Sequence, residues 1–511
     1  MPTTINTNIM SLNAQLNLQT SQNSLATSLE RLSSGLQINT AADNAAGFAI
    51  TQQMTAQING INQAAQNAND GISMAQTAQG GLNAEIGLLQ SMRTLAVQAA
   101  NGTNSASDRQ SIQAQIAQLQ QELSRTALST QFNGQNILDG TMSDAQFQVG
   151  ANAGQTINFG IANTQGSAIG NNAFSTGGAM TGAIASTTST ASGNGVTAQT
   201  LTVQGSIGSA NISVSANDSA YTIASNVNNQ SASTGVTASA LTQAEMSGLA
   251  SGGTISFGLT GSNGTAVTIN ASVTSTSDLS SIANAINADT ASTGISAYAD
   301  QSGHLFMTQS QGYDIKITSL TDSAIASGGN IFSTGGGISN FGTNAQQTAV
   351  NVVSGGSATV GGQVSFESAS AYSLKSSVAG TASGGSVLNT TTAAGATVGS
   401  SLNAVSSIDV TTVTNGTPVG ANNAINTIDM ALQTLNTIAA NLGSVQNRFQ
   451  DTITNLQTTS NNLSAARSRI QDTNYAQETS NMTRSQILQQ AGTAMLAQAN
   501  QLPNMVLTLL K

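Results

Sequence analysis

Cysteine and tryptophan are absent from the 511 residues, and charged side chains are scarce. Without cysteine the chain can form no disulfide, no thiolate-ligated zinc site and no cysteine nucleophile. Charged residues make up 6% of the chain, against about 25% in ordinary soluble proteins. Few side chains are therefore left for acid–base, metal or phosphate chemistry. The lack of cysteine leaves the compartment open, since such a chain is stable in reducing and oxidising surroundings alike.

Positive charge is the scarcer sign. Eleven Lys and Arg residues face 21 Asp and Glu residues, and the formal net charge is −10. Nucleic acids and anionic membranes bind clusters of Lys and Arg, so we expect neither as a partner. Residues 1–10 hold no Lys or Arg and no apolar core of a secretory signal, and no run of about 18 apolar residues predicts a membrane span. A protein working outside the cell would then be exported without a cleaved signal peptide.

No group of residues predicts catalysis. His304 is the single histidine, and no Ser, Asp or Glu motif surrounds it. A structural or surface histidine is the favoured interpretation. The chain contains no phosphate-binding Gly-x-x-x-x-Gly-Lys, no His-Glu-x-x-His and no Gly-x-Ser-x-Gly. Asp289, Asp300 and Asp314 lack the spacing of a calcium loop. We expect no catalytic residue, no cofactor site and no metal site, and hence no enzyme.

Three zones follow one another along the chain. Helical periodicity dominates residues 1–140 and 421–511, whereas residues 141–420 are rich in Gly, Ser, Thr and Ala with alternating apolar residues. The arginines all lie in the two helical zones. This pattern predicts an α+β multidomain fold, with a long α-helical coiled-coil or rod core formed by both termini and mostly β outer domains from the middle of the chain.

A seven-residue repeat marks the rod. The C-terminal zone carries it at Ile428, Leu435, Leu442, Phe449, Leu456, Leu463 and Ile470. A matching series runs through residues 61–96. Sustained seven-residue spacing predicts a left-handed coiled-coil seam. A helix of about 55 residues is roughly 80 Å long, and rods of that length serve spacing and assembly more often than catalysis.

The extreme ends carry weaker apolar stripes. The N-terminal stripe consists of Ile5, Ile9, Leu12, Leu16, Leu25, Leu29, Leu32 and Leu36. The C-terminal stripe consists of Leu488, Met495, Leu502, Val506 and Leu509. Many of the residues between are Asn, Ser and Thr, which are mediocre helix formers. We expect the ends to be disordered in a monomer and to fold where a partner covers each stripe. Their predicted role is an assembly seam.

The middle zone contains an internal repeat. Residues 217–240 and 276–299 match at an offset of 59, with Ile223 on Ile282 and Gly235 on Gly294. Each copy reads as a helix, a turn and a strand, preceded by strand-like alternation, which predicts two ββαβ units. A Gly-rich loop is predicted next, at residues 323–345. Short strands are predicted again at residues 349–353, 364–366 and 408–413.

Both ends resemble bacterial flagellins, in the right order and over about half the chain. The N-terminal matches are Ile5 to Asn8, residues 28–50, Leu89 to Thr103 and Gln131 to Leu138. The C-terminal matches are Asn447 to Phe449, Ala465 to Asp472 and Ser480 to Leu510. The repeats of the middle zone are similar, more loosely, to a module of some flagellin outer domains.

The resemblance implies a domain order. It assigns 1–40 and 460–511 to a terminal coiled-coil domain that lines an inner tube, 41–165 and 415–459 to a helical rod domain with a β-hairpin, and 166–414 to an outer variable β-rich region with ββαβ-like repeats near 201–242 and 255–320. It also implies a subunit that self-assembles into the flagellar filament for swimming, outside the cell.

The implied partners are other copies of the chain, the flagellar export machinery with an export chaperone, and the filament cap and junction proteins. Two other functions stay open. A hook–filament junction protein would have similar termini, but with weaker matches. A Ser/Thr-rich surface adhesin would normally carry a secretory signal.

Host innate immune receptors are further implied partners. Residues 30–51 resemble the peptide that the plant receptor binds, and Leu89 to Gln98 resemble the helix face that the animal receptor binds. Strongly sensed relatives carry Arg at the position of Ser91 and Glu at that of Gln115, so we expect weak recognition by the animal receptor. The residues expected to face receptors are Asp43, Gly47, Arg93, Leu95 and Gln98.

Overall fold

The computed structural model describes residues 7–176, 183–340, 349–379, 385–388, 393–414 and 417–509, with the side-chain surroundings of 334, 335, 340 and 502–509 left out. The chain divides into two compact units. Unit 1 comprises Met1–Gln76, Asp144–Gly160 and Leu442–Lys511, and unit 2 comprises Thr77–Ser143 and Ile161–Asn441.

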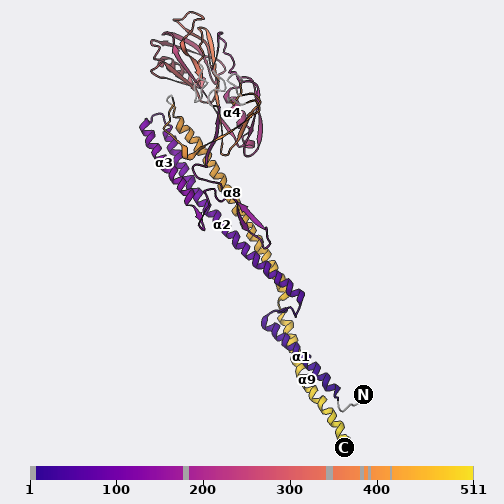
Figure 1. Ribbon diagram of the computed structural model, residues 1–511. Coiled ribbons are helices and arrows are strands. Elements are labelled where there is room, and N and C mark those ends of the chain that lie inside the picture. Colours follow the sequence, from indigo (N-terminus) through magenta and orange to yellow (C-terminus); the bar gives the residue numbers. More distant parts are fainter. Residues whose placement is uncertain are drawn as a thin grey trace. The chain divides into compact units, whose positions relative to one another are not determined.

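The helices concentrate at the two ends of the chain (Figure 1). They are α1 (Ile9–Ser34), α2 (Ala45–Ala99), α3 (Ala106–Ser129), α4 (Ala220–Asn228), α5 (Ser231–Thr234), α6 (Ser280–Ala288), α7 (Thr290–Thr293), α8 (Val419–Gln471) and α9 (Tyr475–Leu509), with the 3₁₀ turn η1 (Val405–Ser407). The long α2 and α8 have 55 and 53 residues.

The strands lie between α3 and α8. They are β1 (Gln131–Phe132), β2 (Gln135–Asn136), β3 (Ala145–Gln148), β4 (Thr156–Phe159), β5 (Gly170–Ser175), β6 (Ile184–Ser186), β7 (Gln199–Gln204), β8 (Ser209–Val214), β9 (Thr237–Leu249), β10 (Gly253–Thr260), β11 (Val267–Val273), β12 (Ile295–Ala299), β13 (His304–Gln309), β14 (Ile315–Asp322), β15 (Phe332–Asn340), β16 (Gly356–Val360), β17 (Gln363–Ser368), β18 (Ser373–Ser376), β19 (Thr397–Gly399) and β20 (Ser401–Ala404). The prediction of helical ends with a β-rich middle is confirmed.

In unit 1, α2 and α8 pair in antiparallel fashion. Ser460 donates to Asn62 at 3.2 Å, and Arg467 donates to the Thr55 hydroxyl at 3.2 Å. Further along, the Phe449 ring fills the space beside Gly71, where an added Cβ would lie 2.7 Å from the ring. The small residue on α2 and the large residue on α8 are therefore complementary, as close packing requires.

The β3–β4 hairpin completes the core around Phe449. Phe147 and Phe159 stack on each other with ring centroids 5.6 Å apart. Each ring also meets Phe449 edge to face, at 5.5 and 6.0 Å. The Asn67 amide on α2 donates to the Gln148 carbonyl at 2.9 Å, which ties the hairpin to the helix.

In unit 2, α3 is stabilised by a cap at its N-terminus and by side-chain hydrogen bonds to the segment before α8. Its N-terminus carries a capping box, in which Ser105 and Asp108 exchange side-chain and backbone hydrogen bonds. The Gln113 side chain on α3 donates to the Ile408 carbonyl at 3.0 Å and accepts from the Val410 N–H at 2.9 Å. On α2, Arg93 donates to Asp429 of α8 at 2.6 Å.

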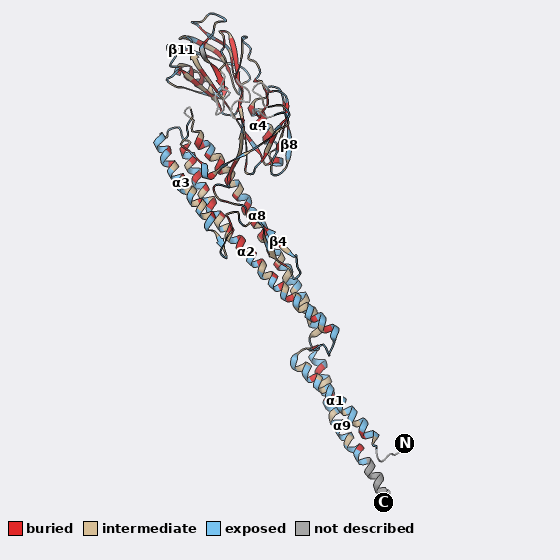
Figure 2. Ribbon diagram, in the orientation of Figure 1, coloured by how far each residue is buried: buried red, intermediate tan, exposed pale blue. Residues whose placement is uncertain are grey.

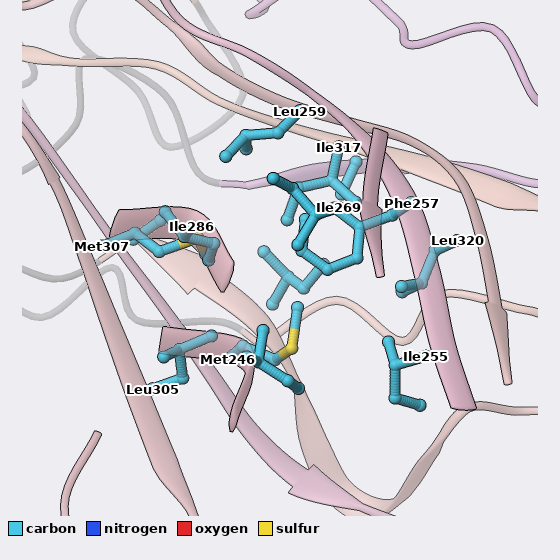
Figure 3. Close-up of a cluster of buried hydrophobic side chains, with 14 of the residues drawn as sticks. Met246, Ile255, Phe257, Leu259, Ile269, Ile286, Leu305, Met307, Ile317 and Leu320 are labelled. Carbon is cyan, nitrogen blue, oxygen red and sulfur yellow. The ribbon is translucent and has the colours of Figure 1, made fainter. Parts of the chain in front are cut away.

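The strands of unit 2 form antiparallel sheets around two apolar cores. One sheet has the order β11-β10-β14-β16-β6, another β12-β13-β9-β17-β5-β20 with β15 also on β9, and a third β19-β18-β7-β8. Phe257, Ile269 and Ile317 belong to the core that Figure 3 shows, where α6 contributes Ile286. The second core gathers residues of β7, β8, α4 and β17, including Phe366.

The repeat units contain one more helical turn than expected. The order is β7-β8-α4-α5-β9 in the first and β10-β11-α6-α7-β12 in the second. Gly235 and Gly294 end the extra turns with φ angles of +73° and +69°, a left-handed conformation that glycine adopts without strain.

Three local predictions are wrong. Residues 349–353, predicted as a strand, form only isolated bridges, Val350 with Ile338 and Val353 with Asn330. Residues 408–413 form no strand, because the Gln113 side chain takes the Ile408 carbonyl and the Val410 N–H that a strand partner would use. The Gly-rich segment at 323–345, predicted as a loop, contains β15, which pairs with β9.

Gly71→Ala should destabilise unit 1. The new methyl group would meet Phe449 at 2.7 Å inside a packed core, and overpacking costs about 1–3 kcal/mol. Urea unfolding followed by circular dichroism should then show a lower midpoint concentration of urea for the variant than for the parent. Gly443→Ala on α8 is the matched control, because nothing lies within 4 Å of its added Cβ, and it should be stabilising through helix propensity. An equally stable Gly71→Ala chain would contradict the packing of Phe449 against α2.

Candidate functional site

The terminal helices α1 and α9 lie side by side in unit 1 (Figure 1). Most of the less exposed residues of α1 recur every seven positions in two series: Ser11, Leu18, Leu25 and Leu32, then Ala14, Ser21 and Ser28. Those of α9 recur likewise: Glu478, Ser485, Gly492 and Ala499, then Met482, Gln489 and Leu496. We call this contact the terminal seam. It is a coiled-coil contact built largely from small and polar residues.

Hydrogen bonds hold both ends of the terminal seam. The Ser11 hydroxyl donates to Asn500 at 2.7 Å, and the Asn8 amide donates to the Ala499 carbonyl at 2.8 Å. At the other end, Gly35 closes α1 with a φ of 72°, and the Thr473 N–H donates to its carbonyl at 2.9 Å. The two helices are therefore antiparallel and joined through their backbones.

Large apolar residues lie outside the terminal seam. Exposed fractions are 61% for Ile9, 50% for Leu12, 64% for Leu16 and 49% for Leu29 on α1. On α9 they are 59% for Ile487, 51% for Leu488 and 62% for Met495. We call these seven residues the exposed stripe. Figure 2 shows how much of α1 and α9 is exposed.

The residues predicted as one N-terminal stripe divide between two environments. Leu25 and Leu32 belong to the terminal seam, and Leu36, half-buried, lies beyond the end of α1. Ile9, Leu12, Leu16 and Leu29 belong to the exposed stripe. Leu488 and Met495 of the predicted C-terminal stripe are also exposed. Ile5 lies outside the described residues, as do the side chains of Leu502, Val506 and Leu509. The sequence did not show this division, because an apolar residue at helical spacing does not reveal which neighbour it faces. The role of these residues as an assembly seam stays a prediction.

The predicted rod heptad also changes character along α8. Exposed fractions are 0% for Ile428, 0% for Leu435, 2% for Leu442 and 0% for Phe449. Leu456, Leu463 and Ile470 are only half-buried. The heptad residues are therefore fully buried up to Phe449 and partly exposed to solvent after it.

Family models match both ends of the chain and its middle. A model described as the bacterial flagellin N-terminal helical region matches residues 5–143, and one described as the C-terminal helical region matches residues 425–510. A flagellin hook IN motif matches twice, at residues 200–251 and 254–311.

Curated relatives match over the whole chain. B-type flagellin of Pseudomonas aeruginosa is 42% identical over 517 residues, covering 100% of both chains. The chain belongs to the bacterial flagellin family. Flagellin of Salmonella typhimurium is 35% identical over 535 residues, again covering 100% of both. A solved structure of FliC from Burkholderia pseudomallei covers 74% of this chain and 99% of its own at 22% identity, with a TM-score of 0.28, too low to bear on the fold.

As a flagellin, the chain is a structural subunit that self-assembles into the helical filament of the bacterial flagellum for swimming. The hook–filament junction alternative is weaker, because relatives named flagellin match the chain from end to end. Within the described residues, no helix is long and apolar enough to cross a membrane.

Three of the five residues predicted to face receptors, Asp43, Gly47 and Arg93, make specific contacts within this flagellin. The Asp43 carboxylate accepts from the N–H groups of Asn39 and Thr40, which lowers its pKa. Gly47 is buried, with an added Cβ only 2.5 Å from the Ile38 side chain. These contacts shape the turn before α2. The remaining three residues lie on α2: Arg93, Leu95 and Gln98. Arg93 is ion-paired with Asp429, Leu95 is half-buried, and Gln98 is exposed.

His304 has a specific partner that the sequence did not reveal. Its Nδ1 lies 2.5 Å from a carboxylate oxygen of Glu245 on the neighbouring strand β9. The ring also stacks near Phe306, with centroids 6.1 Å apart. In the described part of the chain, no group of three or more His, Asp and Glu side chains is arranged to hold a metal ion.

A buried carboxyl was also missed. Glu85 on α2 is fully buried and accepts a hydrogen bond from the Thr164 hydroxyl at 2.9 Å, whereas its other oxygen has no partner among the described residues. Burial raises the pKa of Glu85 to about 8. The sequence offered a weak signal only, a single Glu at a position between the apolar Leu82 and Leu89.

Glu85→Gln should flatten the pH dependence of stability. Glu85 titrates near 4.5 in the unfolded chain and near 8 in the folded one. Between these values only the unfolded chain releases the proton, so the free energy of unfolding falls with rising pH, by at most about 1.4 kcal/mol per pH unit. Urea unfolding of both chains at pH 5 and pH 8 measures the difference.

As the pH rises from 5 to 8, the free energy of unfolding of the Glu85→Gln chain should increase relative to that of the parent. Glu122→Gln, which removes an exposed carboxylate paired with Arg125, should show no such gain. A constant difference between the Glu85→Gln and parent chains across the pH range would mean that Glu85 is ionised in the folded state at neutral pH.

Proposed function

We propose that the exposed stripe is the polymerisation device of this flagellin. The observation that carries the proposal is the contrast between the two faces of the same helices. The terminal seam between α1 and α9 contains mainly small and polar residues, while Leu12, Leu16 and Met495 lie 50%, 64% and 62% exposed. Apolar side chains left outside a folded contact favour association with another surface.

The weak terminal seam couples folding to assembly. Burial of apolar surface contributes about 25 cal/mol per Å², and ordering each residue costs about 1–2 kcal/mol of backbone entropy. A seam with few large apolar side chains offsets little of that cost, so α1 and α9 are marginal as an isolated pair. Neighbouring copies that cover the exposed stripe supply the missing burial. The free monomer therefore stays monomeric until it meets a growing filament end.

The domain roles follow from this device. Residues 1–40 and 460–511 line the inner tube, and residues 41–165 and 415–459 form the rod around it. Residues 166–414, including the repeats near 201–242 and 255–320, face solvent. The role is structural and not catalytic, in keeping with the family.

Export and partners complete the proposal. The chain leaves the cell through the flagellar export machinery with an export chaperone, and it meets the filament cap and junction proteins during assembly. Host receptors that bind the segments around Asp43 and Arg93 respond weakly in the animal case, because Ser91 and Gln115 differ from strongly sensed relatives. A reporter-cell assay of Ser91→Arg with Gln115→Glu should show stronger activation than the parent.

The double variant Leu12→Ser with Leu16→Ser tests the exposed stripe. Both side chains are exposed in the monomer, so its thermal unfolding should stay unchanged. The critical concentration for growth on filament fragments should rise at least about tenfold, since 1.4 kcal/mol is a factor of ten. Sedimentation and electron microscopy measure it. The matched control is Asn13→Ser with Asn17→Ser, at exposed polar positions of the same helix. Equal polymerisation of both variants would refute the proposal.

A further inference from the structure

Two tyrosine rings of unit 2 lie face to face. Tyr221, at the start of α4, and Tyr313, in the turn between β13 and β14, stack with ring centroids 4.3 Å apart and planes inclined by 19°. We propose that this pair is an oxidative cross-linking site, at which hydrogen peroxide and a haem peroxidase join the two rings as dityrosine within one subunit. The link ties the first repeat to the turn that follows β13 of the second. This proposal goes beyond filament assembly, and a dilute monomer is enough to test it.

The backbone holds the two rings in place. The Tyr221 N–H donates to the Gly312 carbonyl, next to Tyr313, at 3.0 Å. The Asn194 side-chain amide bridges the flanking residues, since it donates to the Asp218 carbonyl at 2.9 Å and to the Asp314 carboxylate at 3.1 Å. Both chain segments that carry the rings are therefore tied to each other, and the stack is a fixed contact.

The hydroxyls of the two rings lie on the same side of the stack. A hydrogen bond with the Tyr221 side chain raises the pKa of the Tyr313 hydroxyl, which brings the two oxygens together. The ring carbons ortho to these oxygens then lie beside each other as well. Ortho carbons carry much of the unpaired electron density of a phenoxyl radical, so they are the atoms at which two such radicals couple.

The coupling reaction balances with one peroxide. Each tyrosine loses one electron and its hydroxyl proton, and the two radicals form a carbon–carbon bond between their ortho carbons. The hydrogens on these two carbons then move to the oxygens, which restores both phenols. Hydrogen peroxide accepts the two electrons and two protons and leaves as two molecules of water. The haem peroxidase carries the electrons from the rings to the peroxide.

Exposure and pairing select this pair among the five tyrosines, all of which the structure describes. Tyr221 is 40% exposed, so an oxidant reaches it from solvent. Tyr298 and Tyr475 are also exposed, but neither ring contacts another tyrosine, and Tyr372 is buried. Because the chain contains no cysteine, dityrosine is a covalent link between distant segments that it can form without a disulfide.

Peroxidase treatment of the dilute full-length monomer tests the pair. Equal amounts of unlabelled and isotopically heavy chain are mixed, oxidised with hydrogen peroxide and a plant peroxidase, and digested by a protease that cleaves after Asp and Glu. This digestion releases Tyr221 in the peptide 219–245, Tyr298 in 290–300 and Tyr313 in 301–314. Mass spectrometry then identifies which peptides are joined with loss of two hydrogen atoms, and whether both come from one chain.

The expected product joins peptides 219–245 and 301–314 of one chain. A partner held in contact has an effective concentration in about the millimolar range or above, whereas the exposed Tyr298 and Tyr475 meet partners only at the micromolar concentration of the protein. The expected product should therefore be at least about tenfold more abundant than any product of these two tyrosines.

Tyr313→Phe keeps the stacked ring but has no hydroxyl to oxidise, so it should lose the link, whereas the matched control Tyr298→Phe should keep it. After oxidation, the parent should unfold at a higher urea concentration than the oxidised Tyr313→Phe chain, because the link restricts the unfolded chain. Absence of the expected product, or its formation mainly between unlabelled and heavy chains, would overturn the site. A linked parent with an unchanged urea midpoint would overturn its role in tying the repeats together.

Discussion

The antiparallel pairing of α2 with α8 is the interaction on which the rest of the fold depends. It brings together residues about 400 positions apart, such as Thr55 with Arg467 and Asn62 with Ser460. Closing so long a loop costs entropy that grows only slowly with its length, so the intervening β-rich region can vary in size at little cost to the pairing. What the pairing requires is shape complementarity, which Gly71 of α2 supplies beside the Phe449 ring of α8. That requirement restricts which residues the helices can carry at these positions.

The contact between helices buries fewer large side chains in the α1–α9 pair than in the α2–α8 pair, and this difference bears on assembly. Where α2 meets α8, large side chains are fully buried up to Phe449. In the terminal seam, Ser11, Ser28 and Ser485 occupy the corresponding inward positions. A terminal seam that buried all the large apolar side chains of α1 and α9 would leave little apolar surface for a neighbouring subunit to bury. Leu12, Leu16 and Met495 face outward instead, and under the proposal above only the filament buries them.

Seven-residue periodicity in the sequence was sufficient to predict the long helices, and the internal offset of 59 residues was sufficient to find the repeats. The periodicity could not show which neighbouring element each leucine contacts. Leu25 and Leu29 are close neighbours in one stripe, yet only Leu25 faces α9. Likewise, nothing in the residues 408–413 showed that Gln113, nearly 300 positions earlier, would take their backbone hydrogen bonds. Periodicity reports local geometry, whereas partners are chosen by tertiary packing and by side chains distant in sequence.

The outer repeats show how a variable region can still fold as one block. β9 pairs with β17 through residues 237–241 and with β13 through residues 242–247, so one strand serves the sheets of both repeats. Met246 of the same strand lies in the core around Phe257, and Ala238 lies in the core around Phe366. Neither repeat therefore has a complete sheet without the other. Their duplication in the sequence could suggest two independent modules, but the shared strand makes them one cooperative structure, and insertions are better tolerated in its loops than at the junction between the two copies.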